Sequence, residues 1–201
     1  SIFRNAGQVC LAGSRLYVQS GIYDEFVRRY QSAAEAMVVG DPKDPSTQFS
    51  AALASDEHFT KVQSYLDPAA LGGGRIITGG VGEGWSVQPT IVVDAPSDAK
   101  VVREEVFGPV VVATKFETEE EALALANATR YGLNAMVFTE NLSRAHRLSA
   151  ELRAGTVWVN CFFIRDLRAP FGGVGESGLG REGGTFSREF FTEPKAVVMQ
   201  I

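Results

Sequence analysis

The sequence lacks several features that would assign it to a broad class of proteins at once. No apolar run in its 201 residues approaches the roughly 20 residues that a membrane-spanning helix needs. Its formal net charge of -5 provides no basic surface for nucleic acid or for an anionic membrane. No internal repeat or low-complexity tract is visible. These absences predict a globular protein with neither nucleic acid nor a membrane as its partner.

Cysteine and histidine are also scarce, with two residues of each. His58 and His146 stand alone in expected helices, without metal-ligand spacing to Cys, Asp or Glu, so we expect packed or surface histidines and no metal. No Walker motif and no Ser-His-Asp arrangement is visible. Cys10 and Cys161 could pair in principle, but reduced thiols in a cytoplasmic protein are the simpler expectation for a domain of this size.

The composition, 45% hydrophobic and 21% charged, is typical of one α/β domain. Residues 110–114 form a continuous apolar run, which is typical of a buried parallel strand. Pro89 indicates that its strand is an edge or carries a bulge. Strand and helix patterns alternate, which predicts one domain over residues 1–201, a largely parallel sheet flanked by helices. Strands are expected at 15–19, 75–78, 87–93, 110–114, 136–139 and 155–160, and helices at 21–37, 55–66, 118–128 and 142–152.

The end of the chain is expected to form a short helix near residues 187–191 and a strand at 196–201. That strand is short, apolar and unprotected, and such an edge invites pairing with another chain. The pattern therefore predicts a C-terminal oligomerisation strand and a homo-oligomer.

The first fifteen residues hold the candidate nucleophile. Gly7 permits a tight turn, Gln8 supplies an orienting amide, and the small residues after Cys10 could open a helical turn. A thiol near a helix N-terminus sees partial positive charge, which favours the thiolate and makes a nucleophile. The alternative is a buried structural cysteine between Val9 and Leu11, because free cysteines are usually small hydrophobes.

Three later segments have motif character. Residues 104–109 read Glu-Glu-Val-Phe-Gly-Pro, which a simple turn before a buried strand would also explain. A carboxylate there could accept both hydroxyls of a ribose, and a neighbouring aromatic ring could cover a nicotinamide. Residues 155–160 read Gly-Thr-Val-Trp-Val-Asn, and residues 170–182 are rich in glycine, which permits backbone that other residues could not follow.

In this order the segments resemble the signatures of the aldehyde dehydrogenase superfamily. F-x-N-x-G-Q-x-C-x-x-x-x-R over residues 3–15 is similar to the family's active-site cysteine motif, with Cys10 as the nucleophile. E-E-x-F-G-P, G-x-V-W-V-N and P-F-G-G-x-x-x-S-G-x-G-R-E follow, and the resemblance spans essentially all 201 residues. It implies an aldehyde substrate and NAD or NADP as cofactor, with NAD favoured.

The resemblance also implies roles for particular residues. Glu105 would hold the nicotinamide ribose and Phe107 would pack near the ring. Phe171 would line the aldehyde tunnel, and Asn160 would belong to the substrate-binding residues. In this family the C-terminal region helps to build dimers and tetramers, which supports the expectation of a homo-oligomer.

Residues 162–168, Phe-Phe-Ile-Arg-Asp-Leu-Arg, lie where aldehyde dehydrogenases shape the substrate mouth. A cation is costly to desolvate in an apolar tunnel, but charge-assisted hydrogen bonds to a carboxylate offset that cost. The segment resembles the 2-hydroxymuconic and 2-aminomuconic semialdehyde dehydrogenases, which implies that Arg165, and more weakly Arg168, bind a substrate carboxylate. The alternative is a surface salt bridge from Arg165 to Asp166 or Glu176.

The resemblance further implies that parts of the machinery lie outside this chain. The family's dinucleotide-binding domain, its general-base glutamate and the asparagine that stabilises the oxyanion all precede the cysteine motif. We therefore expect a catalytic-domain fragment that is inactive by itself. Two alternatives remain open: an acylating, CoA-dependent semialdehyde dehydrogenase, and a non-catalytic oligomerisation or regulatory fragment.

Overall fold

The computed structural model describes residues 1–201, which form two compact units, Ser1–Ala128 and Thr129–Ile201. The single domain that the sequence predicted over residues 1–201 stays a prediction beside this division into two units. None of the helices has both the length and the apolar character needed to cross a membrane.

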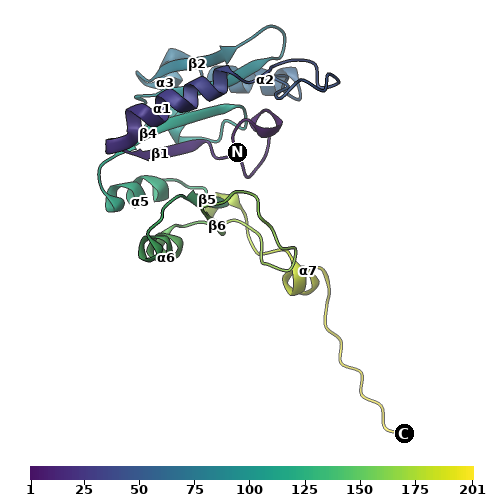
Figure 1. Ribbon diagram of the computed structural model, residues 1–201. Coiled ribbons are helices and arrows are strands. Elements are labelled where there is room, and N and C mark those ends of the chain that lie inside the picture. Colours follow the sequence, from purple (N-terminus) through teal and green to yellow (C-terminus); the bar gives the residue numbers. More distant parts are fainter. The chain divides into compact units, whose positions relative to one another are not determined.

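A four-stranded sheet organises the first unit (Figure 1). The central strand β4 (Val110–Phe116) pairs in parallel with β1 (Arg15–Gln19) on one side and with β3 (Val87–Val93) on the other. The strand β2 (Arg75–Val81) runs antiparallel to β3 at the edge, which completes the order β1-β4-β3-β2. The expectation of a largely parallel sheet is confirmed.

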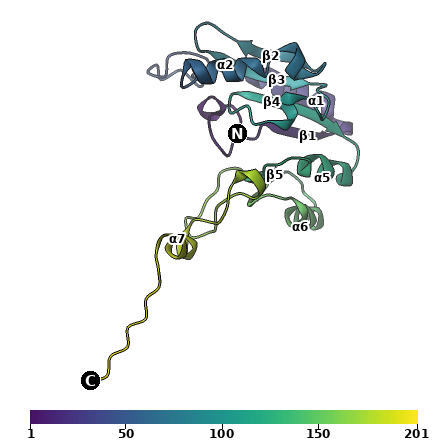
Figure 2. The same cartoon turned by 180° about the vertical axis from the view of Figure 1, so that it is seen from behind.

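Helices cover both faces of this sheet, as continuous apolar strands require. Val110 and Val112 of β4 point to one cluster, and Val111 and Ala113 point to the other. The long helix α1 (Ser20–Glu35) packs on the second cluster. The helices α2 (Asp56–Ser64), α3 (Pro68–Leu71) and α4 (Lys100–Arg103) contribute to the first cluster, on the face shown in Figure 2.

Pro89 lies in β3, which is an internal strand. The prediction of an edge strand is therefore wrong, and the alternative prediction of a β-bulge is confirmed. The β2–β3 ladder shifts register between Ile76 and Thr78 and again between Thr78 and Gly80, opposite this proline. A Cβ added at Gly79 would lie 2.2 Å from the Pro89 carbonyl oxygen, so only glycine allows β2 to approach there. The bulge absorbs the missing N–H of proline in the middle of the sheet.

Side-chain caps begin the two helices that the sequence predicted at residues 55–66 and 118–128. Ser55 accepts the His58 amide at the start of α2, and Thr118 accepts the Glu121 amide at the start of α5 (Glu119–Asn127). Two of the last carbonyls of α5 also have partners, because the Arg15 guanidinium donates to the carbonyls of Leu125 and Ala126 at 3.3 and 3.1 Å.

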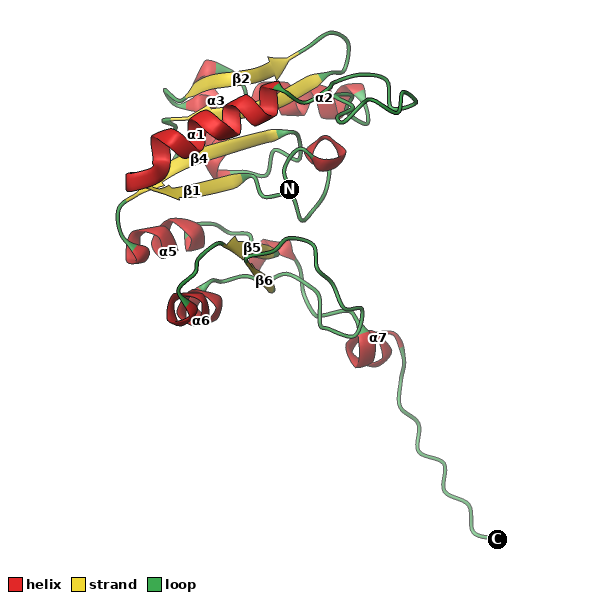
Figure 3. Ribbon diagram, in the orientation of Figure 1, coloured by secondary structure: helices red, strands yellow, loops and turns green.

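The second unit is built on a pair of parallel strands, β5 (Asn134–Val137) and β6 (Thr156–Val159). The helix α6 (Leu142–Glu151) connects them, and the short turn η2 (Gly175–Ser177) and the helix α7 (Gly184–Phe191) follow. Within this chain the segment after α7 pairs with no other strand (Figure 3), so the strand expected at residues 196–201, which was to pair with another chain, stays a prediction.

Candidate active site

Cys10 lies on a tight turn at the surface of the first unit. The Ala12 amide donates to the Val9 carbonyl at 2.9 Å, which makes Cys10 the second residue of that turn. The residue is exposed, which disfavours a buried structural cysteine. The helical turn expected after it is wrong, since the chain enters β1 at Arg15 and too few residues intervene for a helix. No helix begins at Cys10, so the partial positive charge of a helix N-terminus does not stabilise its thiolate.

The loop before Cys10 has an unusual backbone. Within the 3-10 turn η1 (Arg4–Gly7), Asn5 and Ala6 both have a φ of 52°, and Gly7 has a φ of 70°. Asparagine and glycine tolerate this left-handed region, whereas for Ala6 it costs about 1–2 kcal/mol. Such residues cluster at functional sites, where the surrounding structure holds them in place.

Close backbone packing brings the cysteine loop to the Glu-Glu-Val-Phe-Gly-Pro segment. A Cβ added at Gly7 would lie 2.1 Å from the Gly108 carbonyl oxygen. A Cβ added at Gly108 would in turn lie 2.9 Å from Cγ1 of Val62, which is fully buried on α2. Two glycines thus allow the loop, the segment and α2 to stack directly. The motifs that the sequence placed about a hundred positions apart are neighbours in space.

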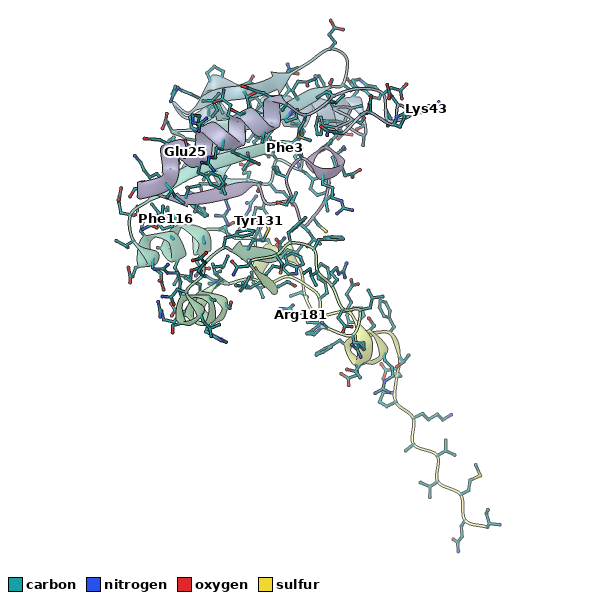
Figure 4. The ribbon with its side chains drawn as sticks, in the orientation of Figure 1. Phe3, Glu25, Lys43, Phe116, Tyr131 and Arg181 are labelled. Carbon is teal, nitrogen blue, oxygen red and sulfur yellow. The ribbon has the colours of Figure 1, made fainter.

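Side chains also fasten the cysteine loop to its surroundings. The ring of Phe3, labelled in Figure 4, stacks on Tyr30 of α1 with centroids 5.8 Å apart. Burial raises the pKa of Tyr30 to about 12. The Gln8 amide oxygen accepts the Ala54 N–H at 3.0 Å, so the orienting role expected of Gln8 is directed at the segment before α2.

Substituting alanine for Gly7 in the full-length protein is expected to destabilise it by about 2–5 kcal/mol, because a Cβ would meet the Gly108 carbonyl and the left-handed backbone would be strained. The thermal midpoint measures this loss. Gly21→Ala is the matched control, since Gly21 lies in α1 with nothing within 4 Å of an added Cβ. Equal midpoints for the two variants would contradict the tight packing at Gly7.

The two adjacent glutamates of the second motif have different environments. Glu104 is engaged, because its Oε2 accepts the Tyr65 hydroxyl at 2.9 Å. Glu105 is exposed, and its carboxylate has neither an ion-pair nor a hydrogen-bond partner in the structure. Phe107 is half-buried and has a φ of 58°. Glu105 is therefore the carboxylate of this motif that is available to a ligand.

The candidate residues of the first unit lie towards the amino ends of the parallel strands, since Cys10 precedes β1 and Glu105 and Phe107 precede β4. A cavity of about 130 Å³ adjoins the cysteine loop and is lined partly by Asn5 and Gln8. Another cavity, of about 560 Å³, lies near the carboxyl ends of β3 and β4, away from these residues.

The closing motifs come together within the second unit. A Cβ added at Gly155, just before β6, would lie 1.6 Å from the Gly172 carbonyl oxygen. The Arg181 guanidinium, labelled in Figure 4, donates to the carbonyls of Gly173 and Gly180 at 2.7 Å each. These contacts give the glycines and the arginine of the motif a structural role, as the sequence indicated for most of them.

The ion pairs around the arginine-bearing loop, residues 162–168, do not match the alternative in which Arg165 forms a salt bridge with Asp166 or Glu176. Asp166 pairs with Arg168, whose hydrogen bonds lower the pKa of Asp166. Glu176 pairs with Arg130 at 3.1 Å. Arg165 has no acidic partner, and its guanidinium carbon lies 4.4 Å from the centroid of the Phe171 ring. Arg165 therefore keeps its hydrogen-bond donors, whereas the paired Arg168 already directs its own at Asp166.

Asn160 and Trp158 hold the base of this loop. Asn160 has a φ of 53°, and its amide accepts the Thr139 N–H and donates to the Thr139 carbonyl, each at 2.8 Å. The Trp158 indole donates to the Ile164 carbonyl at 2.9 Å. The Asn160 amide is thus occupied by backbone, and its contact with substrate stays a prediction.

The two histidines have different surroundings. His146 is exposed on α6, whereas His58 is half-buried and its Nε2 lies 2.8 Å from the Phe107 carbonyl oxygen. The sequence allowed a partly packed His58 but gave no sign of this contact, because the partners are 49 residues apart. No group of three or more His, Cys, Asp or Glu side chains is placed to hold a metal ion.

The structure has an α/β fold in which an exposed cysteine lies on a loop packed against the Glu-Glu-Val-Phe-Gly-Pro segment, and comparison with known proteins identifies the family. The model of the aldehyde dehydrogenase family matches residues 1–197. This chain belongs to the aldehyde dehydrogenase family.

Curated relatives are similar over the whole chain. The 2-hydroxymuconic semialdehyde dehydrogenase of Pseudomonas sp. strain CF600 is 48% identical over 100% of this chain and 43% of its own length. A betaine aldehyde dehydrogenase of Cereibacter sphaeroides is 47% identical over 97% of this chain and 41% of its own length. The chain therefore spans less than half the length of these relatives.

Solved structures share the fold. PnpE in complex with nicotinamide adenine dinucleotide has a TM-score of 0.90 and is 42% identical, covering 96% of this chain and 40% of its own. An aldehyde dehydrogenase from Bacillus cereus in an NAD+ complex has a TM-score of 0.90 and is 35% identical over the same shares.

Proposed function

We propose that the protein containing this chain oxidises an aldehyde to a carboxylic acid with a nicotinamide cofactor. The observation that carries the proposal is the packing of Gly7 on Gly108, which places the loop of the exposed Cys10 beside the segment of the unpaired Glu105. Family membership and NAD-bound structures of similar proteins support it.

The residues present fit such a cofactor. Glu105 offers an unpaired carboxylate that can accept two ribose hydroxyls, and Phe107 offers a half-buried aromatic ring beside it. A bound nicotinamide supplies the acceptor for hydride. We propose NAD in preference to NADP, because the similar structures named above hold NAD.

The proposed chemistry begins at the Cys10 sulfur. The thiolate attacks the aldehyde carbon and forms a carbon–sulfur bond, while the carbonyl electron pair becomes an oxyanion. The Cys10 backbone N–H can donate to that oxyanion, together with an asparagine that the family supplies from another part of the protein. Loss of hydride from the carbon restores the carbonyl as a thioester. Water then adds to the thioester carbon and the carbon–sulfur bond breaks, which releases the carboxylic acid and the thiolate, and the remaining proton goes to a general base from another part of the protein.

We propose a carboxylate-bearing semialdehyde of the 2-hydroxymuconic type as the substrate. Sequence identity alone does not choose between two kinds of relative, which are 48% and 47% identical to this chain. By their names, one acts on a semialdehyde and the other on betaine aldehyde, which is a cation. Arg165 favours the anion: its guanidinium has no acidic partner and is held over Phe171.

Turnover by the full-length protein tests the proposed function. Reduced cofactor should form with 2-hydroxymuconic semialdehyde in the absence of CoA, and the product should be the free acid. A thioester of CoA as the product would favour the acylating alternative, and no turnover with any aldehyde would favour a non-catalytic role.

We also propose a homo-oligomer, a dimer or a tetramer. Residues 193–201 pair with nothing in this chain, and Val198 and Met199 are 92% and 80% exposed. An apolar segment left in this state is expected to find a partner strand or surface. Light scattering of the full-length protein at micromolar concentration should show an oligomer that Val198→Glu weakens and Gln200→Glu does not. A monomeric wild-type protein would contradict the proposal.

A further inference from the structure

We infer that His58 is a positioning residue for the cofactor site, an inference that rests on the proposed function. The side chain comes from the first turn of α2, is half-buried, and places Nε2 2.8 Å from the Phe107 carbonyl oxygen. The two rings also meet edge to face, with centroids 6.1 Å apart. His58 therefore contacts both the backbone and the ring of the residue assigned to the nicotinamide.

The Phe107 backbone needs such a contact. Its φ of 58° is a conformation that a bulky non-glycine residue rarely adopts, and it persists only where surrounding interactions hold it. The carbonyl that His58 binds belongs to this strained residue.

The start of α2 is held by several contacts, so the His58 side chain projects from a fixed backbone. Ser55 accepts the His58 amide at 3.1 Å, and Gln8 of the cysteine loop accepts the Ala54 amide at 3.0 Å. One turn further along α2, the fully buried Val62 packs against Gly108. The start of α2 thus contacts both the nucleophile loop and the cofactor segment.

The contact requires a hydrogen-bond donor and no charge. A carbonyl oxygen only accepts, so the His58 ring must carry a proton on Nε2, as one neutral tautomer and the protonated ring both do. A glutamine side chain has an N–H of comparable reach, whereas asparagine is too short and leucine has no donor. The three substitutions therefore separate loss of the donor from loss of bulk.

The test uses the full-length protein and measures the dissociation constant of NAD by calorimetry, together with KM for NAD and kcat. His58→Leu and His58→Asn are expected to weaken NAD binding by about 10- to 100-fold. The reason is that the Phe107 carbonyl loses its hydrogen-bond donor and the left-handed backbone of Phe107 is no longer held in place. At saturating NAD, kcat should change by less than about threefold. His58→Gln should restore NAD affinity to within about threefold of wild type, and His146→Gln is the exposed-histidine control.

A cooperative thermal unfolding transition serves as the readout of folding, and every variant used in the comparison should show one. If His58→Leu does not fold, the comparison of asparagine with glutamine carries the test. Unchanged NAD affinity in His58→Asn, or an equal loss in His58→Gln, would overturn the inference. A wild-type protein that binds no NAD would instead refute the proposed function, so the two failures are distinguishable.

Discussion

Replacing Cys10 with alanine in the full-length protein is expected to lower aldehyde oxidation by about ten-thousand-fold or more, because the proposed mechanism forms the carbon–sulfur bond at the Cys10 sulfur. Covalent labelling of the active site by iodoacetamide should disappear with it. The structure supports this expectation through the position of Cys10, which is exposed on a turn and held by a loop packed against Gly108.

Cys161→Ala is the matched control for this experiment, since Cys161 is the chain's other thiol and is partly buried after β6. It should leave activity and labelling at the level of wild type. A labelled peptide that contains Cys161, or undiminished labelling of Cys10→Ala, would move the nucleophile elsewhere.

Removing the guanidinium of Arg165 is expected to reduce kcat/KM for 2-hydroxymuconic semialdehyde by about thirty- to a thousand-fold, which corresponds to roughly 2–4 kcal/mol of transition-state binding. The same Arg165→Ala variant should lose far less with a neutral aldehyde such as hexanal. The reason is that a bidentate, charge-assisted contact exists only when the substrate brings a carboxylate.

Two further variants refine this prediction. Arg168→Ala should cost less than Arg165→Ala, because Arg168 already directs its donors at Asp166. Arg165→Lys should recover part of the loss, since lysine keeps the charge but not the forked geometry. Equal losses for Arg165→Ala on the two substrates would mean that the arginine shapes the loop and binds no carboxylate, and the narrowed substrate class would be wrong.

Several elements could be predicted from local sequence alone, because their causes are local. The apolar run in β4 predicted a buried parallel strand, and the helix starts expected at residues 55 and 118 coincide with the caps Ser55 and Thr118 of α2 and α5. The family motifs likewise predicted Cys10 and Glu105, since both belong to short segments of characteristic composition. Each of these signals lies within a window of about one helix or strand.

Local patterns failed where the outcome depended on distant partners. The small residues after Cys10 suited a helix, but the nearby start of β1 left room only for a turn. Pro89 was compatible with an edge strand, yet glycine on β2 let it sit inside the sheet with a bulge. Residues 196–201 have a strand composition, but a strand forms only where another backbone completes its hydrogen bonds, so this strand stays a prediction.

The sequence by itself determined most of the strands and the longer helices, and it indicated which residues are candidates for the family's chemistry, because apolar periodicity, capping side chains and short motifs act over a few residues. Only the tertiary structure decided that Gly7 meets Gly108, that Glu104 is engaged while Glu105 is available, and that His58 holds the Phe107 carbonyl. These contacts join residues dozens of positions apart. Their existence depends on how the whole sheet and its helices pack, which no local pattern specifies.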